Sequence, residues 1–233
     1  MYEAVHARPD GESTVSRLAS TAAEYGFAGI VIRNHGDALP DYDRASIADT
    51  YGIDVVSGVE VRAEDRSRAS GFVGNHRESK TIVAVHGGDL DMNRFAVEQP
   101  AVDVLAHPMA GDGDVDHVVV KTAAENSVHI EWSLREVLRA EGGQRVSALR
   151  DLTKLRDLIQ EYDAPYVVSA DPRTHLQLRA PRDLAGLGEA LDCSESWIES
   201  GLAAWGTLTT RNRERTSEHF VEPGVRREAS DDR

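Results

Sequence analysis

The sequence predicts an α/β fold, an irregular TIM-barrel-like β/α barrel. Short runs that are almost entirely apolar, such as Ile30-Val31-Ile32, are typical of parallel strands covered on both faces. Amphipathic segments separate these runs, and more than six such units in one chain favour a closed barrel. An open doubly wound sheet is the alternative, but no G-x-G-x-x-G motif follows the first predicted strand.

Seven strands are predicted before the chain turns wholly helical. They span residues 2–6, 29–33, 54–61, 81–86, 103–106, 129–132 and 166–169. After residue 169 we predict helices and no convincing eighth strand, which is why we expect the barrel to be irregular.

The helices are predicted from capping residues and from apolar residues at helical spacing. Ser13 or Thr14 could cap a first helix that runs to Tyr25 before Gly26. Further helices are predicted over 91–99, 116–126, 146–162 and 182–191. Residues 62–80 are predicted to form a loop with a local excess of two positive charges. We expect one domain over 1–215 and a polar, disordered tail over 216–233.

Charge and cysteine content exclude several classes of protein. The 233 residues carry a net charge of −14, and 23 of the 26 basic residues are arginine, which favours adaptation to concentrated salt. An acidic protein from a high-GC genome is the alternative. The single cysteine, Cys193, rules out an internal disulfide framework and a four-cysteine zinc site. With no apolar run long enough to span a membrane, we expect a cytoplasmic protein.

Polar residues collect where the predicted strands end, which is where α/β barrels carry their functional side chains. The candidate cleft residues are His6, His35, Glu60, His86, His107 and Glu131, and Arg33, Arg62 and Asp171 occupy similar positions. Such a set suits metal-dependent phosphoester hydrolysis, although solvated strand ends are the alternative. A metal site of that type usually has an H-x-H pair on its first strand, and Ala4 and His6 stand at that spacing here.

Several ordered motifs resemble the archaeal-type ribonuclease P protein component 3 family, whose eukaryotic relative is the thirty-kilodalton subunit of ribonuclease P and MRP. The longest matching segments are residues 103–108, 123–131 and 178–184. Shorter ones are Asn34-His35, Gly58-Val59-Glu60, residues 85–89 and Asn93-Arg94. The resemblance covers roughly residues 2–215, and the order of the segments makes it specific.

The resemblance implies a TIM-barrel-like fold related to the PHP phosphoesterases. It also implies a protein subunit of an RNA-based endoribonuclease that removes the 5′ leader from precursor tRNA. It implies that the RNA carries the chemistry with Mg²⁺, that no residue of this chain is catalytic, and that the protein itself holds no metal or other cofactor. The implied partners are the ribonuclease P RNA, a second protein component in a heterodimer or heterotetramer, and further protein subunits. Ala4 in the H-x-H position agrees with a barrel that no longer catalyses.

Arginines are the expected contacts to RNA, because a guanidinium binds phosphate through two hydrogen bonds and stacks on bases even when salt screens long-range attraction. The candidates are Arg62, Arg66, Arg68, Arg77, Arg94 and Arg179. Two other classes of function stay open at this point. One is a metal-dependent phosphoesterase that acts alone, and the other is a protein scaffold whose partner makes all contacts to RNA.

Overall fold

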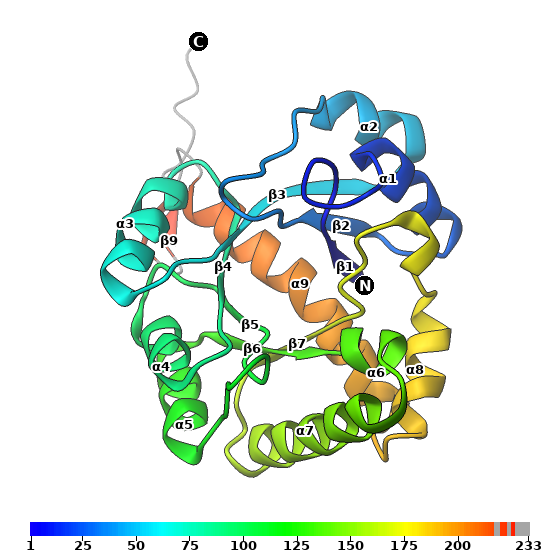
Figure 1. Cartoon of the computed structure of the whole chain (residues 1–233). Coiled ribbons are helices and arrows are strands. Elements are labelled where there is room, and N and C mark those ends of the chain that lie inside the picture. Colours follow the sequence, from blue (N-terminus) through cyan, green and yellow to red (C-terminus); the bar gives the residue numbers. More distant parts are fainter. Residues whose placement is uncertain (217–219, 223–224, 227–233) are drawn as a thin grey trace.

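A computed structural model describes residues 1–216, 220–222 and 225–226. Seven parallel strands, each paired with the next along the chain, curl into a nearly closed barrel with helices around its outside (Figure 1). The strands are β1 (Tyr2–Val5), β2 (Gly29–Ile32), β3 (Asp54–Val61), β4 (Ile82–His86), β5 (Val104–Ala106), β6 (His129–Ser133) and β7 (Tyr166–Ser169). All seven predicted strands are confirmed, and among the described residues no eighth strand joins this sheet.

The helices connect the strands and follow the last of them. They are α1 (Val15–Glu24), α2 (Arg44–Tyr51), α3 (Arg66–Arg77), α4 (Leu90–Glu98), α5 (His117–Asn126), α6 (Arg135–Arg139), α7 (Gly142–Glu161), the 3-10 turn η1 (His175–Gln177), α8 (Pro181–Glu189) and α9 (Glu195–Arg215). Thr14 is the residue that caps α1, and its side chain accepts a hydrogen bond from the Arg17 backbone.

The prediction of a loop over 62–80 is wrong, because most of that segment is helix α3. Asp65 caps the helix by accepting a hydrogen bond from the Arg68 backbone, and Ala69 and Val73, four residues apart, are its buried face. The helix was not recognised in the sequence because Gly71 and Gly74 lie within it and glycine disfavours helix. Both glycines lie on α3, and a Cβ atom added at either one would meet no other atom within 4 Å.

A buried carboxylate joins the two edges of the barrel. Within the described residues no strand ladder links β7 to β1. Instead Glu3 accepts hydrogen bonds from Ser169 Oγ at 2.7 Å and from the Ala170 backbone at 3.2 Å, while it also accepts one from the Ala4 backbone. Burial raises the pKa of Glu3 to about 7, although these hydrogen bonds act against the rise.

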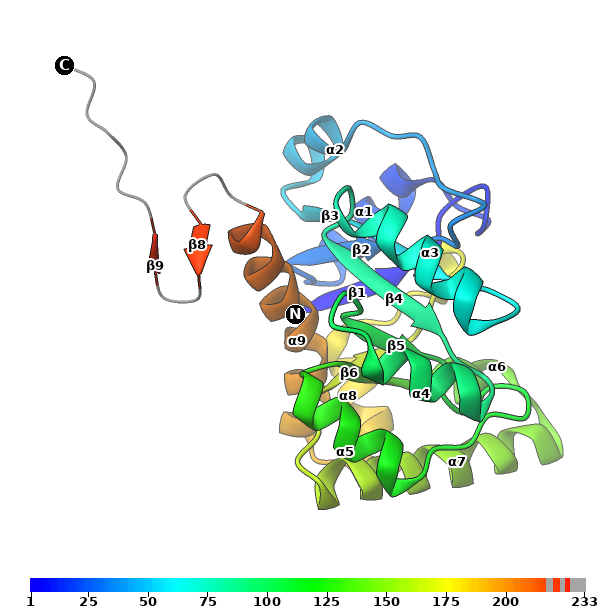
Figure 2. The same cartoon turned by 90° about the vertical axis from the view of Figure 1, so that its left-hand side faces the viewer.

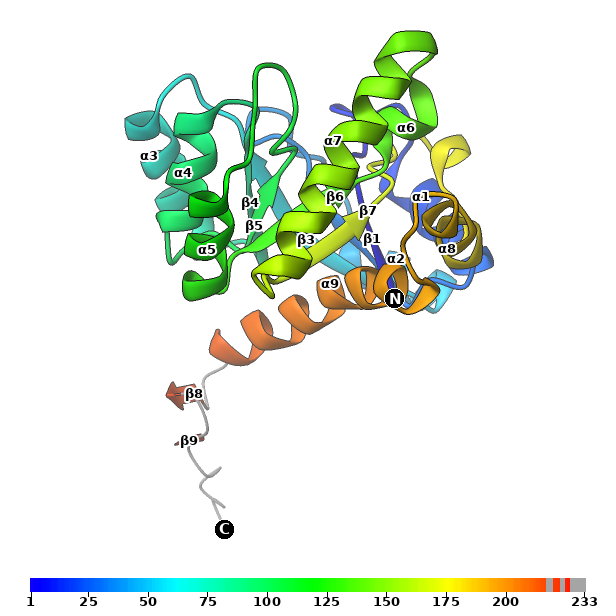
Figure 3. The same cartoon turned by 90° about the horizontal axis from the view of Figure 1, so that it is seen from below.

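Helix α9 closes the N-terminal end of the barrel (Figures 2 and 3). Trp205 and Leu208 pack against the small apolar side chains that the strands turn inward, and the indole of Trp205 donates to the Val168 carbonyl at 3.0 Å. Gly201 allows the close approach, because a side chain there would meet Val168 at 2.4 Å.

Ion pairs hold α9 in place at this end. Asp103, which is almost fully buried, accepts from Arg211 and Asn212 of α9 and from Arg77 of α3. Arg213 makes a second pair with Asp54 at 2.8 Å. The N-terminal end is therefore sealed by a helix that both fills the barrel and is tied to its rim.

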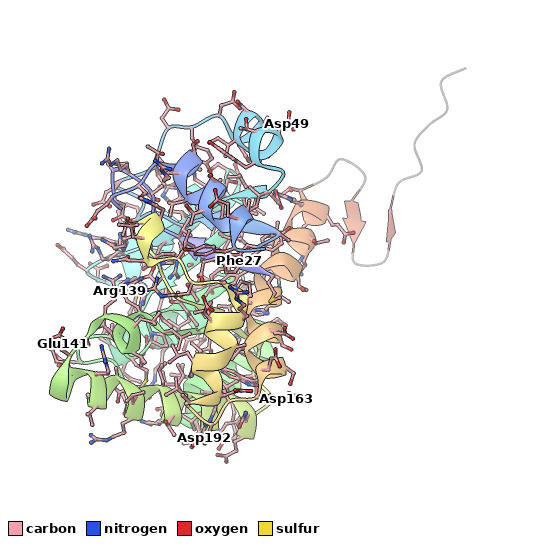
Figure 4. All side chains as sticks on the ribbon, turned by 90° about the vertical axis from the view of Figure 1, so that its right-hand side faces the viewer. Phe27, Asp49, Arg139, Glu141, Asp163 and Asp192 are labelled. Carbon is pink, nitrogen blue, oxygen red and sulfur yellow. The ribbon has the colours of Figure 1, made fainter. Side chains whose placement is uncertain are left out.

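The outer layer of the core lies between the strands and the surrounding helices. Phe27 of the connection into β2 belongs to it and marks the seam between α1 and the sheet (Figure 4). Along the described part of the chain, no helix is long and apolar enough to cross a membrane.

Two short antiparallel strands, β8 (Phe220–Glu222) and β9 (Val225–Arg226), lie in the segment for which a disordered tail is predicted. The other positions of that segment beyond Thr216 lie outside the described residues. The domain boundary at residue 215 stays a prediction.

Candidate functional site at the C-terminal end of the barrel

A pocket of about 650 Å³ opens at the end of the barrel opposite α9. All six predicted cleft residues line it: His6, His35, Glu60, His86, His107 and Glu131. The strand pattern explains this convergence, because side chains two residues apart point to the same face of a strand and the parallel strands all end at one rim.

Arg33 lies beneath this pocket as a fully buried cation among three carboxylates. Its Nη2 atom is 2.7 Å from Glu131 Oε1 and 3.0 Å from Asp171 Oδ1, while Nη1 is 3.4 Å from Glu60 Oε2. The guanidinium also lies 5.8 Å from the ring centre of Trp205. A charged layer thus separates the pocket from the apolar side chains that fill the base of the barrel around Trp205.

Four histidine rings form a continuous arc over this layer. The ring centres of His6, His35, His86 and His107 are 5.2, 5.8 and 5.0 Å apart in that order. Asp10 orients the first two, because its Oδ2 atom lies 2.7 Å from His6 Nδ1 and 2.9 Å from His35 Nδ1.

The carboxylates and the cationic groups shift one another's pKa values. Burial alone would lower the pKa of His6, but hydrogen bonds to Asp10, Asp171 and Glu60 raise it to about 10. Burial would raise the pKa of Glu60 and of Asp171, yet the charge of Arg33 holds both well below their ordinary values. His6, Glu60 and Asp171 are therefore charged throughout the physiological range.

Two site residues have left-handed backbones that only some side chains tolerate. His107 has φ 49° and Asp171 has φ 45°, and His and Asp are among the residue types that adopt this region most readily. Buried Asn93 supports the loop after β5, since its side-chain amide donates to the carbonyls of Pro108 and Asp114. These turns direct both side chains into the mouth of the barrel.

Four of the six arginines predicted to contact RNA follow the ends of β3 and β4, with Arg62 directly after β3, Arg66 and Arg68 on α3, and Arg94 on α4. Arg62 lines the pocket, is exposed, and has no partner within the described chain. Arg66 pairs with Asp91 and Glu98, and Arg68 pairs with Glu64, all exposed. The pair between Arg94 and Asp116 is also largely exposed.

The other two predicted arginines differ from this group. Arg179, before α8, donates only to the backbone carbonyls of Leu176 and Leu178. Arg77 lies at the N-terminal end, where its two terminal nitrogens bond Asp103 and three backbone carbonyls. The structure therefore does not bring Arg77 to the pocket.

Sequence reasoning missed three charged residues of the site. Asp10 follows His6 by four positions, Arg173 lies 3.3 Å from the other oxygen of Asp10, and Arg135 of α6 lies 2.6 Å from Asp171. None of them ends a strand, so the rule used on the sequence could not select them. The neighbouring Arg139 donates to the carbonyls of Ala170 and Asp171, where α6 meets the chain after β7 (Figure 4).

Three sets of side chains bring possible metal ligands within reach of one another. They are His6, Asp10 and His35; His6, His107 and Asp171; and His35, Glu60 and His86. Imidazole nitrogen and carboxylate oxygen are the donors that zinc and similar divalent ions accept in proteins. Ala4 contributes no donor, because its side chain is a methyl group. It is buried among the apolar side chains around Trp205.

Comparison with known proteins places the whole chain in one family. The model of the family described as RNase P subunit p30 matches residues 1–217. A protein of Natronomonas pharaonis named ribonuclease P protein component 3 is 59% identical over 99% of this chain and 97% of its own length. A protein of the same name from Haloarcula marismortui is 58% identical, with 98% and 97% covered.

Two solved structures share the fold. One is a chain of a cryo-EM structure of archaeal ribonuclease P with mature tRNA, with a TM-score of 0.84, 22% identity and both chains covered in full. The other is a histidinol phosphate phosphatase of Lactococcus lactis complexed with zinc, L-histidinol and phosphate, with a TM-score of 0.53 and 10% identity over 91% and 93% of the two chains. Because the family model spans nearly all of the sequence, the chain belongs to the RNase P subunit p30 family.

Proposed function

We propose that this chain is a protein subunit of ribonuclease P and supports an RNA that removes the 5′ leader from precursor tRNA. The observation that carries the proposal is the full-length similarity to haloarchaeal proteins named ribonuclease P protein component 3. The −14 net charge and the excess of arginine over lysine suit the same salt-rich setting.

We assign the catalytic chemistry to the RNA and its Mg²⁺, with no catalytic residue in this chain. Arg33 supports this assignment, because it already balances the carboxylates that a multinuclear hydrolase would use to hold several ions. Ala4 supports it as well, since it leaves the first strand with one imidazole, that of His6. A phosphoesterase that acts alone is therefore not favoured.

The surface that we propose for RNA is the rim of the pocket, with Arg62, Arg66, Arg68 and Arg94, together with Arg179 before α8. Exposed ion pairs are worth only about 0–1 kcal/mol, so Arg66, Arg68 and Arg94 can exchange their carboxylate partners for phosphate at little cost. At high salt the attraction must come from such close hydrogen bonds, because counter-ion release weakens. We leave Arg77 out of this surface, because its hydrogen bonds hold the opposite end of the barrel.

Reconstitution tests the proposal. In-vitro transcribed RNA, this subunit, a second protein component and the remaining protein subunits are mixed, and cleavage of precursor tRNA is measured with each component omitted in turn. We expect no cleavage by this chain alone and a loss of cleavage at limiting Mg²⁺ when it is left out. Cleavage by the chain without RNA would favour the phosphoesterase, and full cleavage in its absence would contradict the proposal.

Footprinting separates direct contact with RNA from scaffolding. The variant Arg62→Glu/Arg66→Glu/Arg68→Glu is expected to lose protection of the RNA that the unchanged subunit gives. Arg215→Glu is the matched control, because Arg215 is an exposed arginine at the opposite end of the barrel. Equal protection by both variants would assign the contacts to the partner protein.

A further inference from the structure

We propose that the mouth of the barrel binds one divalent metal ion of the zinc class, held by Glu60 Oε1 and by ring nitrogens of His35, His86 and His107. This proposal reverses the sequence-based expectation that the protein itself holds no metal. It is independent of the role in ribonuclease P, since it concerns how the ends of four successive strands are held.

The first reason is a buried ring nitrogen without a hydrogen bond. His35 is only 4% exposed, and its Nδ1 lies 2.9 Å from the carboxylate of Asp10, to which it donates. Its other nitrogen, Nε2, faces Glu60 Oε1 at 3.5 Å and has no hydrogen-bond partner. A metal ligand of this kind donates its second ring N–H to a carboxylate in the same way.

The second reason is the spacing of the donor atoms around Glu60 Oε1. That oxygen is 3.5 Å from His35 Nε2 and 3.7 Å from His107 Nε2, and it lies 2.5 Å from His86 Nδ1. The first two separations exceed an ordinary hydrogen bond. Ligands bound to zinc at about 2.0–2.2 Å in a tetrahedron are about 3.4 Å apart, close to those separations. The hydrogen bond from His86 would yield to the ion, as a metal displaces a proton from its ligands.

The third reason is that the other carboxylate oxygens of this layer already face a cationic side chain or a backbone N–H, which limits the site to one ion. Arg33 faces Glu60 Oε2, Glu131 Oε1 and Asp171 Oδ1. Arg135 pairs with Asp171 Oδ2, and Glu131 Oε2 accepts from the His107 backbone. Glu60 Oε1 faces ring nitrogens and no arginine in this layer, so it is the oxygen that we assign to the ion, and the guanidinium takes the place of any second cation.

Three imidazoles and one carboxylate favour zinc over magnesium, which prefers an octahedron of oxygen ligands. The four ligands come from β3, from the end of β4 and from the turns after β2 and β5. One ion would therefore tie together the ends of β3 and β4, which lead to Arg62 and to helix α4 with Arg94, so its effect is to fix the rim of the pocket.

Metal content and stability test the proposal on the full chain. Protein stripped with a chelator is titrated with Zn²⁺ against a chromogenic competitor in molar KCl, and bound zinc is measured after gel filtration. We expect one zinc per chain, a higher melting temperature with Zn²⁺, the visible absorption of a four-coordinate site with Co²⁺, and no displacement by a large excess of Mg²⁺.

Two ligand variants and one control give the comparison. His86→Ala changes a partly exposed ring, and His107→Asn keeps a residue type that tolerates the left-handed backbone. Each should weaken zinc binding by more than about 100-fold, since even groups behind the ligands change affinity by about 10- to 100-fold. His117→Ala, an exposed histidine at the start of α5, should bind zinc like the unchanged protein.

Several results would overturn the proposal. The first is the absence of zinc binding in the unchanged chain. The second is zinc binding by folded His86→Ala and His107→Asn that equals that of the unchanged chain. The third is a second bound zinc ion that both variants lose together with the first. Circular dichroism of each variant before titration establishes that it is folded. Phosphodiesterase activity of the zinc-loaded chain without RNA would leave the ion in place and contradict the proposed function instead.

Discussion

The two ends of the barrel differ in how their buried charged groups are hydrogen-bonded. At the N-terminal end, both oxygens of Asp103 are engaged by side chains from α3 and α9, and a helix covers the strands. At the C-terminal end, His35 Nε2, Arg33 Nη1 and Glu60 Oε2 are buried without a hydrogen bond, and the mouth is open. Orphaned polar atoms cost stability. The closed end has one, His129 Nδ1, whereas at the open end several gather around the pocket, and this contrast identifies the open end as the one kept for function.

The largest effect is expected where the charged layer loses its cation. Arg33→Met leaves Glu60, Glu131 and Asp171 buried together without their counter-ion, and the free energy of unfolding should fall by about 3–5 kcal/mol. Chemical denaturation at fixed salt measures this change. Arg62→Met at the exposed rim is the control and should leave stability unchanged. A stable Arg33→Met protein would mean that protonation, and not Arg33, balances the layer.

A smaller effect is expected at the seam between β1 and β7. Because the folded pKa of Glu3 is about 7 and its ordinary value is 4.5, the folded state binds more protons between these values. Stability should therefore fall as pH rises from about 4.5 to about 7 and then level off, by an amount on the order of 3 kcal/mol. Glu3→Gln should remove this component.

The difference between the denaturation curves of the unchanged protein and of Glu3→Gln, taken at several pH values, isolates the contribution of Glu3. A difference that stays constant with pH would show that Glu3 is already ionised in the folded protein at pH 4.5.

At the closed end, Asp103→Asn should cost about 2 kcal/mol, because hydrogen bonds to a charged group are worth about 1.5–3 kcal/mol. The loss should depend weakly on salt, since Asp103 is only 3% exposed and buried pairs are poorly screened. Denaturation in low and in molar KCl checks both statements. A loss that vanishes in molar salt would mean that water reaches this end of the barrel.

The smallest effect is expected for the exposed pairs of the rim. Arg66→Gln breaks pairs with Asp91 and Glu98, whose side chains are 69% and 48% exposed, and should change stability by less than about 1 kcal/mol. The same variant should weaken protection of the RNA in footprinting. A large loss of stability would assign Arg66 to the fold and remove it from the proposed RNA surface.

Strand positions were predictable because parallel strands covered on both faces are mostly apolar, and the six cleft residues followed from where those strands end. Arg33 was visible in the sequence, but its role was not, since only the closed barrel brings Glu60, Glu131 and Asp171 around it. Helix α3 was missed because its buried face has two residues, Ala69 and Val73, among charges and glycines. Asp10, Arg135 and Arg173 lie in connecting segments, where sequence spacing carries no information about distance.

Helix α9 also imposes an order on how the protein is made. The helix begins at Glu195 and packs against β1, where Gly206 lies beside the ring of Tyr2. The first strand therefore cannot acquire its neighbour at the base of the barrel until the residues of α9 have left the ribosome. Contacts so distant in sequence slow folding. The nascent chain must therefore keep its seven strands from aggregating until α9 has been synthesised.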